Sequence, residues 1–258
     1  MLKIMEEFYT LQGEGLRMGV PSYFIRLGYC HFTCGFCDSK FTWKPKNYSS
    51  INTLEEVNNY VDKIDEKYQE NVDIVITGGE PLWHENIPLL TPMIRSFLNQ
   101  HTVTIETTLT TKPDDIKNKN IDDVLSDILQ DPYLVSRESG KFMFSVSPKL
   151  NMTAYENMDI TIDNVLDYYK PSTDGVFNYC YYKFVHEKET EEVMIDFIKN
   201  RLHQDDLGNI YLMPVTPFPF VKDVYEENKR VTAELCKKLQ VNYSARLHID
   251  LWGLKRGV

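Results

Sequence analysis

The sequence predicts an α/β fold, namely a partial (β/α)6-type TIM barrel with its active site at the carboxyl ends of the strands. Strand-like runs rich in Ile, Val, Phe, Tyr and Thr alternate with helical patterns along the whole chain. This alternation implies parallel strands joined by crossover helices, in an open doubly wound sheet or in a barrel. Nearly every unusual residue falls just past the end of a strand-like run, and barrel enzymes gather their chemistry on that rim. This third observation favours the partial barrel.

The expected elements follow from short-range patterns. Strands are expected over residues 22–27, 72–77, 102–107, 141–146, 179–185, 210–213 and 246–251. The clearest helix begins behind a capping box formed by Thr53 and Glu56. Its apolar face, at helical spacing, consists of Leu54, Val57, Val61, Ile64 and Tyr68. The other helices are expected over residues 87–100, 121–130, 189–201 and 223–239.

Length and composition narrow the class of protein. The 258 residues read as one domain, 1–258, with a peripheral insertion over residues 112–140 that is rich in Asp, Asn and Lys and holds one helix. Hydrophobic residues make up 42% and charged residues 26%, which excludes coiled-coil and wholly disordered chains. With 28 Lys and Arg against 38 Asp and Glu, the net charge is −10, so nucleic acid is not expected as a partner.

Targeting signals are not expected. No run approaches the roughly 18 apolar residues that cross a bilayer, and the first residues are too acidic and too interrupted by glycine for a signal peptide. We therefore expect no membrane association and a cytoplasmic location.

The main chemical signal is a cluster of three cysteines. Cys30, Cys34 and Cys37 follow the strand expected over residues 22–27, with the spacing C-x3-C-x2-C. A structural zinc normally takes four ligands, and the chain has no second C-x-x-C pair. His31 or Asp38 as the fourth ligand would strain so short a loop. A four-iron cluster held by three cysteines leaves one iron open to a small molecule. A zinc knuckle and three buried free thiols remain as alternatives.

The two other cysteines have a different context. Cys180 lies in an expected strand and Cys236 in an expected helix, so both are predicted to be core thiols.

Other strand ends carry glycines, carboxylates and lysines. The segment Thr77-Gly78-Gly79-Glu80-Pro81 exposes backbone groups and a carboxylate that can hold an ammonium group, although two glycines alone indicate a turn. Glu106 ends an apolar run, where it faces a ligand or solvent. Ser147-Pro148-Lys149 and Lys183 lie at or near two further strand ends, and both lysines also fit ordinary charges on the rim.

These features together resemble the radical S-adenosylmethionine (SAM) enzymes. The resemblance rests on C-x3-C-x2-C after the first strand of an α/β chain and on the Gly-Gly-Glu segment after the second. It implies a 4Fe-4S cluster on Cys30, Cys34 and Cys37, whose open iron binds SAM and cleaves it to a 5′-deoxyadenosyl radical. It further implies SAM-binding roles for Phe36, Cys37, Asp38, Gly78, Gly79, Glu80, Glu106, Ser147, Pro148, Lys149, Lys183 and Met213.

Segments at both ends of the chain narrow the resemblance. The stretch FYTLQGEG at residues 8–15, the cysteine stretch continuing as DSKFTW, and RLHIDLWG at residues 246–253 are similar to the 7-carboxy-7-deazaguanine synthase family. The resemblance implies ring contraction of 6-carboxy-5,6,7,8-tetrahydropterin with loss of ammonia, a carbon–nitrogen lyase step in queuosine and 7-deazapurine biosynthesis. It also implies Mg²⁺, an electron donor such as flavodoxin or ferredoxin, and a homodimer.

The same resemblance implies which residues bind the substrate. Gln12, Glu14 and the backbone at Gly13 would read the amide edge of the pterin, and Arg26 would bind its carboxylate. Ser39 matches the position whose hydroxyl meets Mg²⁺, which prefers oxygen ligands. The full expected substrate set is Leu11, Gln12, Gly13, Glu14, Arg26, Thr77, His248 and Val258. A histidine such as His248 is otherwise an ordinary hydrogen-bonded side chain.

One segment departs from the family pattern, and two alternative functions remain open. The family pattern after the third strand is ETxGT or ETQTT, whereas this chain has ETTLT at residues 106–110. A glycyl-radical enzyme activase has the same cysteine spacing but must dock a large protein, and a non-catalytic zinc-binding module would have no turnover at all.

Overall fold

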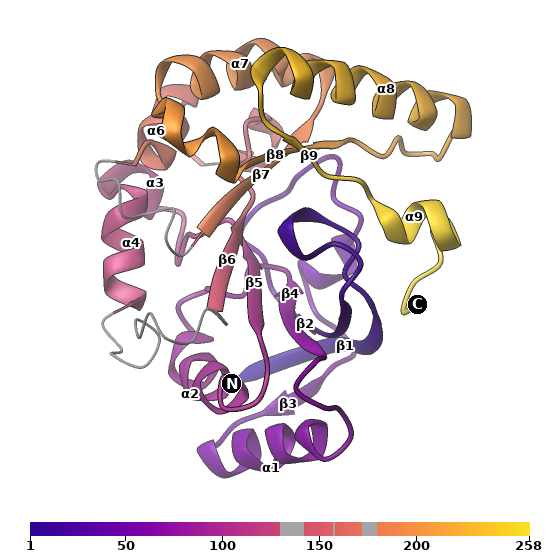
Figure 1. The fold of residues 1–258 in the computed structure, drawn as a ribbon. Coiled ribbons are helices and arrows are strands. Elements are labelled where there is room, and N and C mark those ends of the chain that lie inside the picture. The colour runs from indigo at the N-terminus through magenta and orange to yellow at the C-terminus, as the bar shows by residue number, and fades with distance from the viewer. Residues whose placement is uncertain (130–141, 157, 172–179) are drawn as a thin grey trace.

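A single nine-stranded sheet organises the computed structural model, which describes residues 1–129, 142–156, 158–171 and 180–258 (Figure 1). The spatial order of the strands is β3-β1-β2-β4-β5-β6-β7-β8-β9. The strands are β1 Leu2–Leu11, β2 Pro21–Leu27, β3 Ser49–Ile51, β4 Asp73–Gly78, β5 Val103–Thr107, β6 Phe142–Val146, β7 Cys180–His186, β8 Ile210–Pro214 and β9 Asn242–Tyr243. Strands β2 and β4 to β9 run parallel, and β1 is antiparallel to β2 and to β3.

The parallel sheet confirms the predicted fold class. In the described part of the chain β3 and β9 form the two open edges, as a partial barrel requires. Carboxyl ends of parallel strands lie at one edge of a sheet, so the loops after β2 and β4 to β8 meet there.

Helices connect and cover the parallel strands (Figure 1). They are α1 Leu54–Asp65, α2 Ile87–Phe97, α3 Asp115–Asn118, α4 Ile121–Ile128, α6 Ile162–Tyr169, α7 Glu191–Asn200, α8 Lys222–Leu239 and α9 Leu247–Trp252. The capping box of Thr53 and Glu56 at the start of α1 is confirmed. Its buried side chains, Val57, Val61 and Ile64, repeat at helical spacing, so α1 presents one apolar face to the core.

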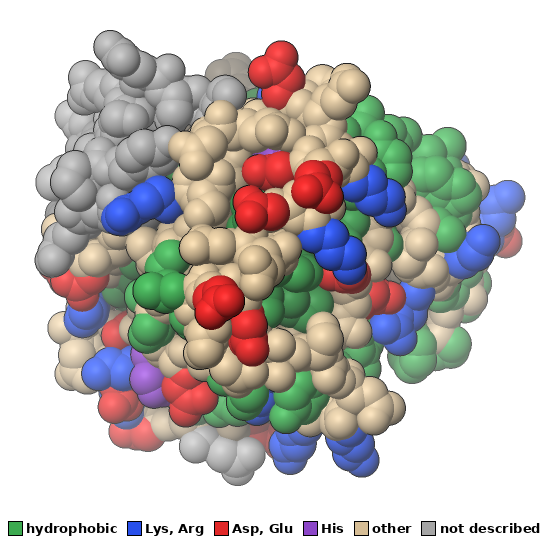
Figure 2. All heavy atoms as spheres, turned by 90° about the horizontal axis from the view of Figure 1, so that it is seen from below, with side chains coloured by type: hydrophobic (Ala, Val, Ile, Leu, Met, Phe, Trp, Pro, Cys, Tyr) green, Lys and Arg blue, Asp and Glu red, His purple; other side chains and the backbone are tan. Residues whose placement is uncertain are grey.

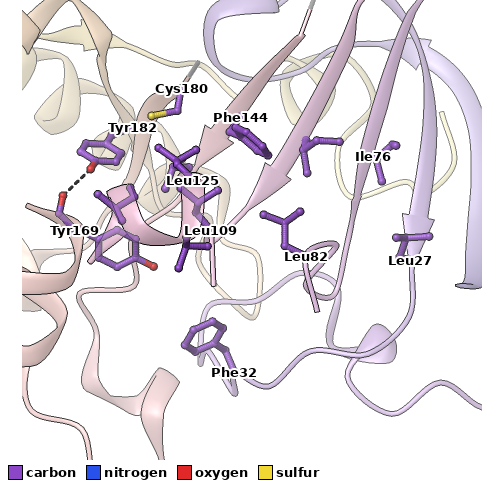
Figure 3. Close-up of a cluster of buried hydrophobic side chains, with 14 of the residues drawn as sticks. Leu27, Phe32, Ile76, Leu82, Leu109, Leu125, Phe144, Tyr169, Cys180 and Tyr182 are labelled. Atoms are coloured by element: carbon purple, nitrogen blue, oxygen red, sulfur yellow. Dashed lines mark hydrogen bonds between the residues drawn. The ribbon is translucent and has the colours of Figure 1, made fainter. Parts of the chain in front are cut away.

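The core lies along the parallel strands (Figure 3). Leu27, Ile76 and Phe144 come from β2, β4 and β6 and are fully buried. Strands covered on both faces carry near-continuous apolar runs, as in β4, where the first five residues are buried. The core continues past the strand ends to Phe32, which is 1% exposed and lies among the loops. The rim that carries the predicted chemistry is therefore built directly on the core.

One predicted strand is wrong. Residues 247–251 lie in α9, which Arg246 directly precedes, and the last strand is the two-residue β9. The alternating letters of RLHIDL imitate a strand, but the burial does not alternate, because Ile249 is buried whereas Leu251 is 52% exposed. The backbone N–H groups of Ile249 and Asp250 instead donate to the carbonyl of Arg246, which begins a helix.

The prediction also missed several elements. Strand β1 carries acidic residues and is half-exposed, so its pattern is weak. Strand β3 has only three residues, and α3 and α6 are short. Within 112–129 the structure has two helices instead of one, α3 and α4, and their Ile116, Ile121 and Val124 belong to the core. The remainder of the predicted insertion, residues 130–140, lies outside the described residues. Whether 112–140 is a peripheral insertion stays a prediction.

The surface carries charges of both signs. Figure 2 shows acidic and basic side chains spread over one face with hydrophobic side chains between them. None of the helices in the described ranges combines the length and apolarity that crossing a membrane requires.

Candidate functional site

A cavity of about 620 Å³ lies at the carboxyl ends of the parallel strands. Its wall includes every predicted site residue except Pro148, which is buried in the loop after β6. The lining residues among the predicted set are Leu11, Gln12, Gly13, Glu14, Arg26, Cys30, Cys34, Phe36, Cys37, Asp38, Ser39, Thr77, Gly78, Gly79, Glu80, Glu106, Ser147, Lys149, Lys183, Met213, His248 and Val258. One cavity thus gathers the predicted side chains, while their individual roles stay predictions.

The cysteine loop, defined here as residues 28–43, follows β2. Tyr29 adopts φ 82° and donates its N–H to the carbonyl of Thr42, which closes the loop. Cys34 is buried and Cys30 and Cys37 are half-buried, and all three line the cavity as free thiols. Burial raises the pKa of each thiol, for Cys34 to about 11, and the ammonium of Lys149 opposes this rise in all three. Thiolates at this place therefore need a metal to stabilise their charge.

The donor set fits a cluster. Among the described residues, no three or more His, Cys, Asp or Glu side chains converge so as to hold a single metal ion. In a four-iron cluster each thiolate binds a different iron, so three sulfurs around one cavity suit it without meeting at a point.

The two glycines after β4 have a clear steric reason. Gly78 has φ 130°, and a Cβ on Gly79 would collide with the carbonyl oxygen of Tyr29. The N–H of Gly79 donates to the carbonyl of Leu27 over 2.9 Å, and the N–H of Glu80 donates to that of Tyr29 over 2.7 Å. We predicted that the two glycines let a ligand approach the backbone closely. In the structure it is the backbone of the cysteine loop that approaches them.

Glu80 is fully buried and its carboxylate accepts four hydrogen bonds. One oxygen accepts from the Thr107 hydroxyl and from the N–H of Leu82 over 3.1 Å. The other accepts from the N–H of Thr108 over 2.8 Å and from its hydroxyl over 2.5 Å. Burial raises the pKa of Glu80, while these hydrogen bonds oppose the rise. The carboxylate therefore ties the loop after β4 to the loop after β5.

A buried charge network forms another part of the wall. The ammonium of Lys183 lies 2.6 Å from a carboxylate oxygen of Glu14 and 3.3 Å from one of Glu106. The side-chain amide of Gln12 donates to Glu106 over 3.3 Å, and Gln12 accepts from the N–H of Glu14 over 3.1 Å. Burial alone would raise the pKa of Glu14, but Lys183 and Arg246 hold it well below its usual value. Glu14 is therefore an anion at every ordinary pH.

Arg246 is a site residue that the sequence prediction missed. Its side chain is 9% exposed, and its Nε lies 3.0 Å from Glu14. Its guanidinium also donates to Asp38 in the cysteine loop and to the Thr216 hydroxyl after β8. The one available signal was an arginine in an apolar run next to His248, which we assigned to a strand. Arg246 joins the two ends of the chain to the cysteine loop.

Arg26 already has partners in this structure. Its Nε lies 3.0 Å from a carboxylate oxygen of Glu6, and its Nη1 donates to the Ser39 hydroxyl over 3.0 Å. The Ser39 hydroxyl in turn donates to Asp38 over 2.9 Å. Glu6 also pairs with Arg256 at 3.3 Å. The predicted carboxylate-binding arginine and the predicted Mg²⁺ position are thus neighbours on one wall.

The two chain ends meet at the cavity. A Cβ on Gly13 would collide with the ring of His248, so only glycine allows this approach. The carbonyl of Gly13 accepts from the N–H of Leu247 over 2.9 Å. Burial lowers the pKa of His248, which favours a neutral ring beside the backbone of Gly13. We call residues 11–15 together with 244–258 the terminal side of the cavity.

The prediction for the remaining cysteines is confirmed. Cys180 and Cys236 are each 4% exposed, belong to the core cluster and do not line the cavity. Figure 3 shows Cys180 among the buried side chains.

The α/β fold and the cysteine loop are similar to those of iron–sulfur proteins. A family model described as a 4Fe-4S single cluster domain matches residues 11–137, which supports the predicted cluster. The matched segment includes the cysteine loop and the Gly-Gly-Glu segment.

Individual relatives carry a more specific name. The chain is 45% identical over 82 residues to a 7-carboxy-7-deazaguanine synthase of Flavobacterium psychrophilum, covering 32% of this chain and 36% of that relative. It is 25% identical to a synthase of the same name from Hyperthermus butylicus, over 96% of this chain and 92% of the relative. The match with the first relative thus spans little more than a third of its length. The predicted resemblance to this family is confirmed.

A solved structure has the same fold. The crystal structure of QueE from Escherichia coli superposes with a TM-score of 0.58 at 24% identity, over 96% of this chain and 94% of that one. The similarity in fold between the two proteins therefore covers almost the full chain.

Proposed function

We propose that this protein is a radical SAM enzyme that converts 6-carboxy-5,6,7,8-tetrahydropterin to 7-carboxy-7-deazaguanine with loss of ammonia, a carbon–nitrogen lyase by outcome. One observation carries the proposal: the three cysteines and Gln12, Gly13 and Glu14 of the Gln-Gly-Glu-Gly segment, specific only in combination, line the same cavity. The relatives that match the chain carry the name of this synthase.

The residues have distinct tasks in this proposal. Cys30, Cys34 and Cys37 hold a 4Fe-4S cluster, which, when bound, supplies the electron that cleaves SAM. The hydrogen-bonded loop at Gly78 and Gly79 lies against the cysteine loop and offers backbone groups to SAM. The remaining walls of the cavity orient the substrate and exclude water from the reacting atoms.

The terminal side reads the pterin. Gln12 and Glu14 both line the cavity and are fixed by neighbours, so they bind the pterin without further ordering. The persistent negative charge of Glu14 makes it an acceptor for N–H groups of the pterin ring. Arg26 receives the substrate carboxylate and gives up part of its contact with Glu6 in exchange.

The charge of the wall favours an anionic ligand. Seven Lys and Arg side chains line the cavity against five Asp and Glu, although the whole chain carries a net charge of −10. Lys149 contacts no carboxylate among the hydrogen bonds of the described residues; its Nζ donates to Ser147 over 2.8 Å. This local excess of positive charge suits the carboxylates of both SAM and the pterin.

Further parts of the proposal come from the relatives' family. Mg²⁺ would bind at the Ser39 hydroxyl together with substrate oxygens and waters. We also propose a flavodoxin or ferredoxin as electron donor, a homodimer, and a cytoplasmic location.

Turnover tests the proposal directly. Anaerobically reconstituted protein is mixed with SAM, reductant and the tetrahydropterin, and 7-carboxy-7-deazaguanine is measured against a reaction without pterin. We expect product that depends on the pterin. A protein that cleaves SAM but forms no deazaguanine would contradict the proposed substrate, and one without iron would contradict the class.

The glycyl-radical activase is less well supported. Such an enzyme needs an open rim for a large partner, whereas residues 253–258 line the cavity here. Deoxyadenosine release stimulated by a partner protein instead of the pterin would favour the activase.

A further inference from the structure

A chain of buried hydroxyls connects Glu80 to the cysteine loop. The Thr108 hydroxyl lies 2.5 Å from Glu80 and 2.7 Å from the Thr110 hydroxyl. The Thr110 hydroxyl lies 2.9 Å from Nε2 of His31, which stands between Cys30 and Cys34. All four side chains are at most 8% exposed, so solvent does not compete for these hydrogen bonds.

Counting protons gives this chain a direction. Each hydroxyl has one proton, and that of Thr108 goes to the carboxylate of Glu80. The Thr110 hydroxyl must then donate to Thr108, and its oxygen accepts from the N–H at Nε2 of His31. Among the hydrogen bonds of the described residues, Thr110 is therefore the one that joins His31 to Thr108 and Glu80, and its hydroxyl both donates and accepts.

The backbone around Thr110 is held in place to make this link. Leu109, between the two threonines, has φ 57°, a left-handed conformation that disfavours a leucine. The hydroxyls of Tyr168 and Tyr169 donate to the carbonyls of Leu109 and Thr108. Figure 3 shows Leu109 among the buried side chains of the core, and this burial offsets the backbone strain.

We propose that Thr110 is a positioning residue that fixes the cysteine loop relative to the Gly-Gly-Glu loop through Thr108 and His31. The roles of the two loops toward the cluster and SAM rest on the proposed function. The link itself does not, since it is formed by side chains of the protein alone. Its consequence is that the cluster and the SAM-binding loop keep one relative orientation.

The effect is expected to be local and moderate. The ring of His31 also packs against Phe32, at 4.2 Å between centroids, and against Trp83, at 5.5 Å. These contacts persist without the hydrogen bond, so loss of the Thr110 hydroxyl should loosen the loop but not unfold it.

Three variants separate the link from packing. Thr110→Val removes the hydroxyl and keeps the shape, whereas Thr110→Ser keeps the hydroxyl. Thr104→Val is the matched control, because Thr104 is 1% exposed on β5 and its hydroxyl has no hydrogen-bond partner among the described residues. His31→Phe cuts the same link from its other end if Thr110→Val does not fold.

Amide hydrogen exchange of the reconstituted protein gives the readout. In Thr110→Val and in His31→Phe, we expect the amides of residues 29–37 to exchange about five- to tenfold faster, as the loss of one buried hydrogen bond implies. Those in Thr110→Ser and Thr104→Val should match the unchanged protein. The change that SAM causes in the EPR spectrum of the reduced cluster should alter in Thr110→Val and in His31→Phe, and stay as it is in Thr110→Ser and Thr104→Val.

Two results would overturn the proposal: unchanged exchange at residues 29–37 in both link-breaking variants, or equal acceleration in Thr104→Val. Neither result depends on the pterin. If the unmodified protein forms no deazaguanine, the proposed substrate is wrong. The hydrogen-exchange test of Thr110 remains valid in that case.

Discussion

The two sides of the cavity are held together by different forces. On the cysteine side, comprising residues 28–43, 78–82 and 106–111, backbone contacts and hydroxyls connect the loops around one buried carboxylate, Glu80. On the terminal side, ion pairs among Glu14, Lys183 and Arg246 do so. Backbone hydrogen bonds and hydroxyls thus dominate the side that carries the three cysteines, although Asp38 and Glu106 on this side pair with Arg246 and Lys183. The terminal side is held by buried ion pairs.

The two sides should therefore be sensitive to different substitutions. Close packing tolerates no added volume, whereas ion pairs respond to removal of a partner and to pH. Substitutions on the two sides should therefore fail in different ways.

The largest effect is expected from the cysteine loop itself. Cys34→Ala removes one of three cluster ligands, so iron and sulfide content and SAM cleavage should both be abolished. Cys180→Ala, in the core, should keep the cluster. Equal loss of iron in both variants would contradict the division of the cysteines.

A single methyl group should disrupt the packing of the cysteine side. Gly79→Ala places a Cβ against the carbonyl of Tyr29, so we expect a loss of about 3 kcal/mol or more in the free energy of unfolding. Gly208→Ala is the control, since no atom lies within 4 Å of its Cβ position. Denaturant unfolding of both variants measures the difference; comparable stabilities would show that the two loops are not packed as described.

Removal of Arg246 should affect the terminal side. Arg246→Met leaves Glu14 with Lys183 as its remaining cation, so we expect a loss of about 2–3 kcal/mol and a higher KM for the pterin. Arg230→Met is the control, because Arg230 forms an exposed pair with Glu227 and should change stability by at most about 0.5 kcal/mol. An unchanged KM in Arg246→Met would separate Arg246 from substrate binding.

The smallest expected effect is a pH dependence confined to acid. The pKa of Glu14 is lower in the folded than in the unfolded chain, so its contribution to stability is complete above about pH 4.5 and is lost as pH falls further. The pKa of Lys183 is raised, so its contribution persists up to strongly alkaline pH. Melting temperatures should therefore fall less steeply below pH 4.5 in Glu14→Gln than in the unchanged protein. Parallel curves would argue against this coupling.

Local patterns predicted much of the fold and of the site. The parallel strands, the capping box at Thr53 and the cysteine spacing are all readable within a few residues of sequence. The contact of Arg246 with Asp38 joins residues 208 positions apart, and no short pattern encodes it. The link from Thr110 to His31 likewise depends on the left-handed backbone at Leu109, a position where one of the two forms of the family pattern, ETxGT, has glycine.

In the proposed function, the three free thiols on one cavity wall hold a 4Fe-4S cluster with one iron open to SAM. Mössbauer spectroscopy of anaerobically reconstituted protein, with ⁵⁷Fe in the cluster, tests it most directly. Four irons per chain, one of them shifting when SAM is added, is the predicted result. A protein that binds zinc in place of iron, or whose four irons all remain unchanged with SAM, would contradict the claim.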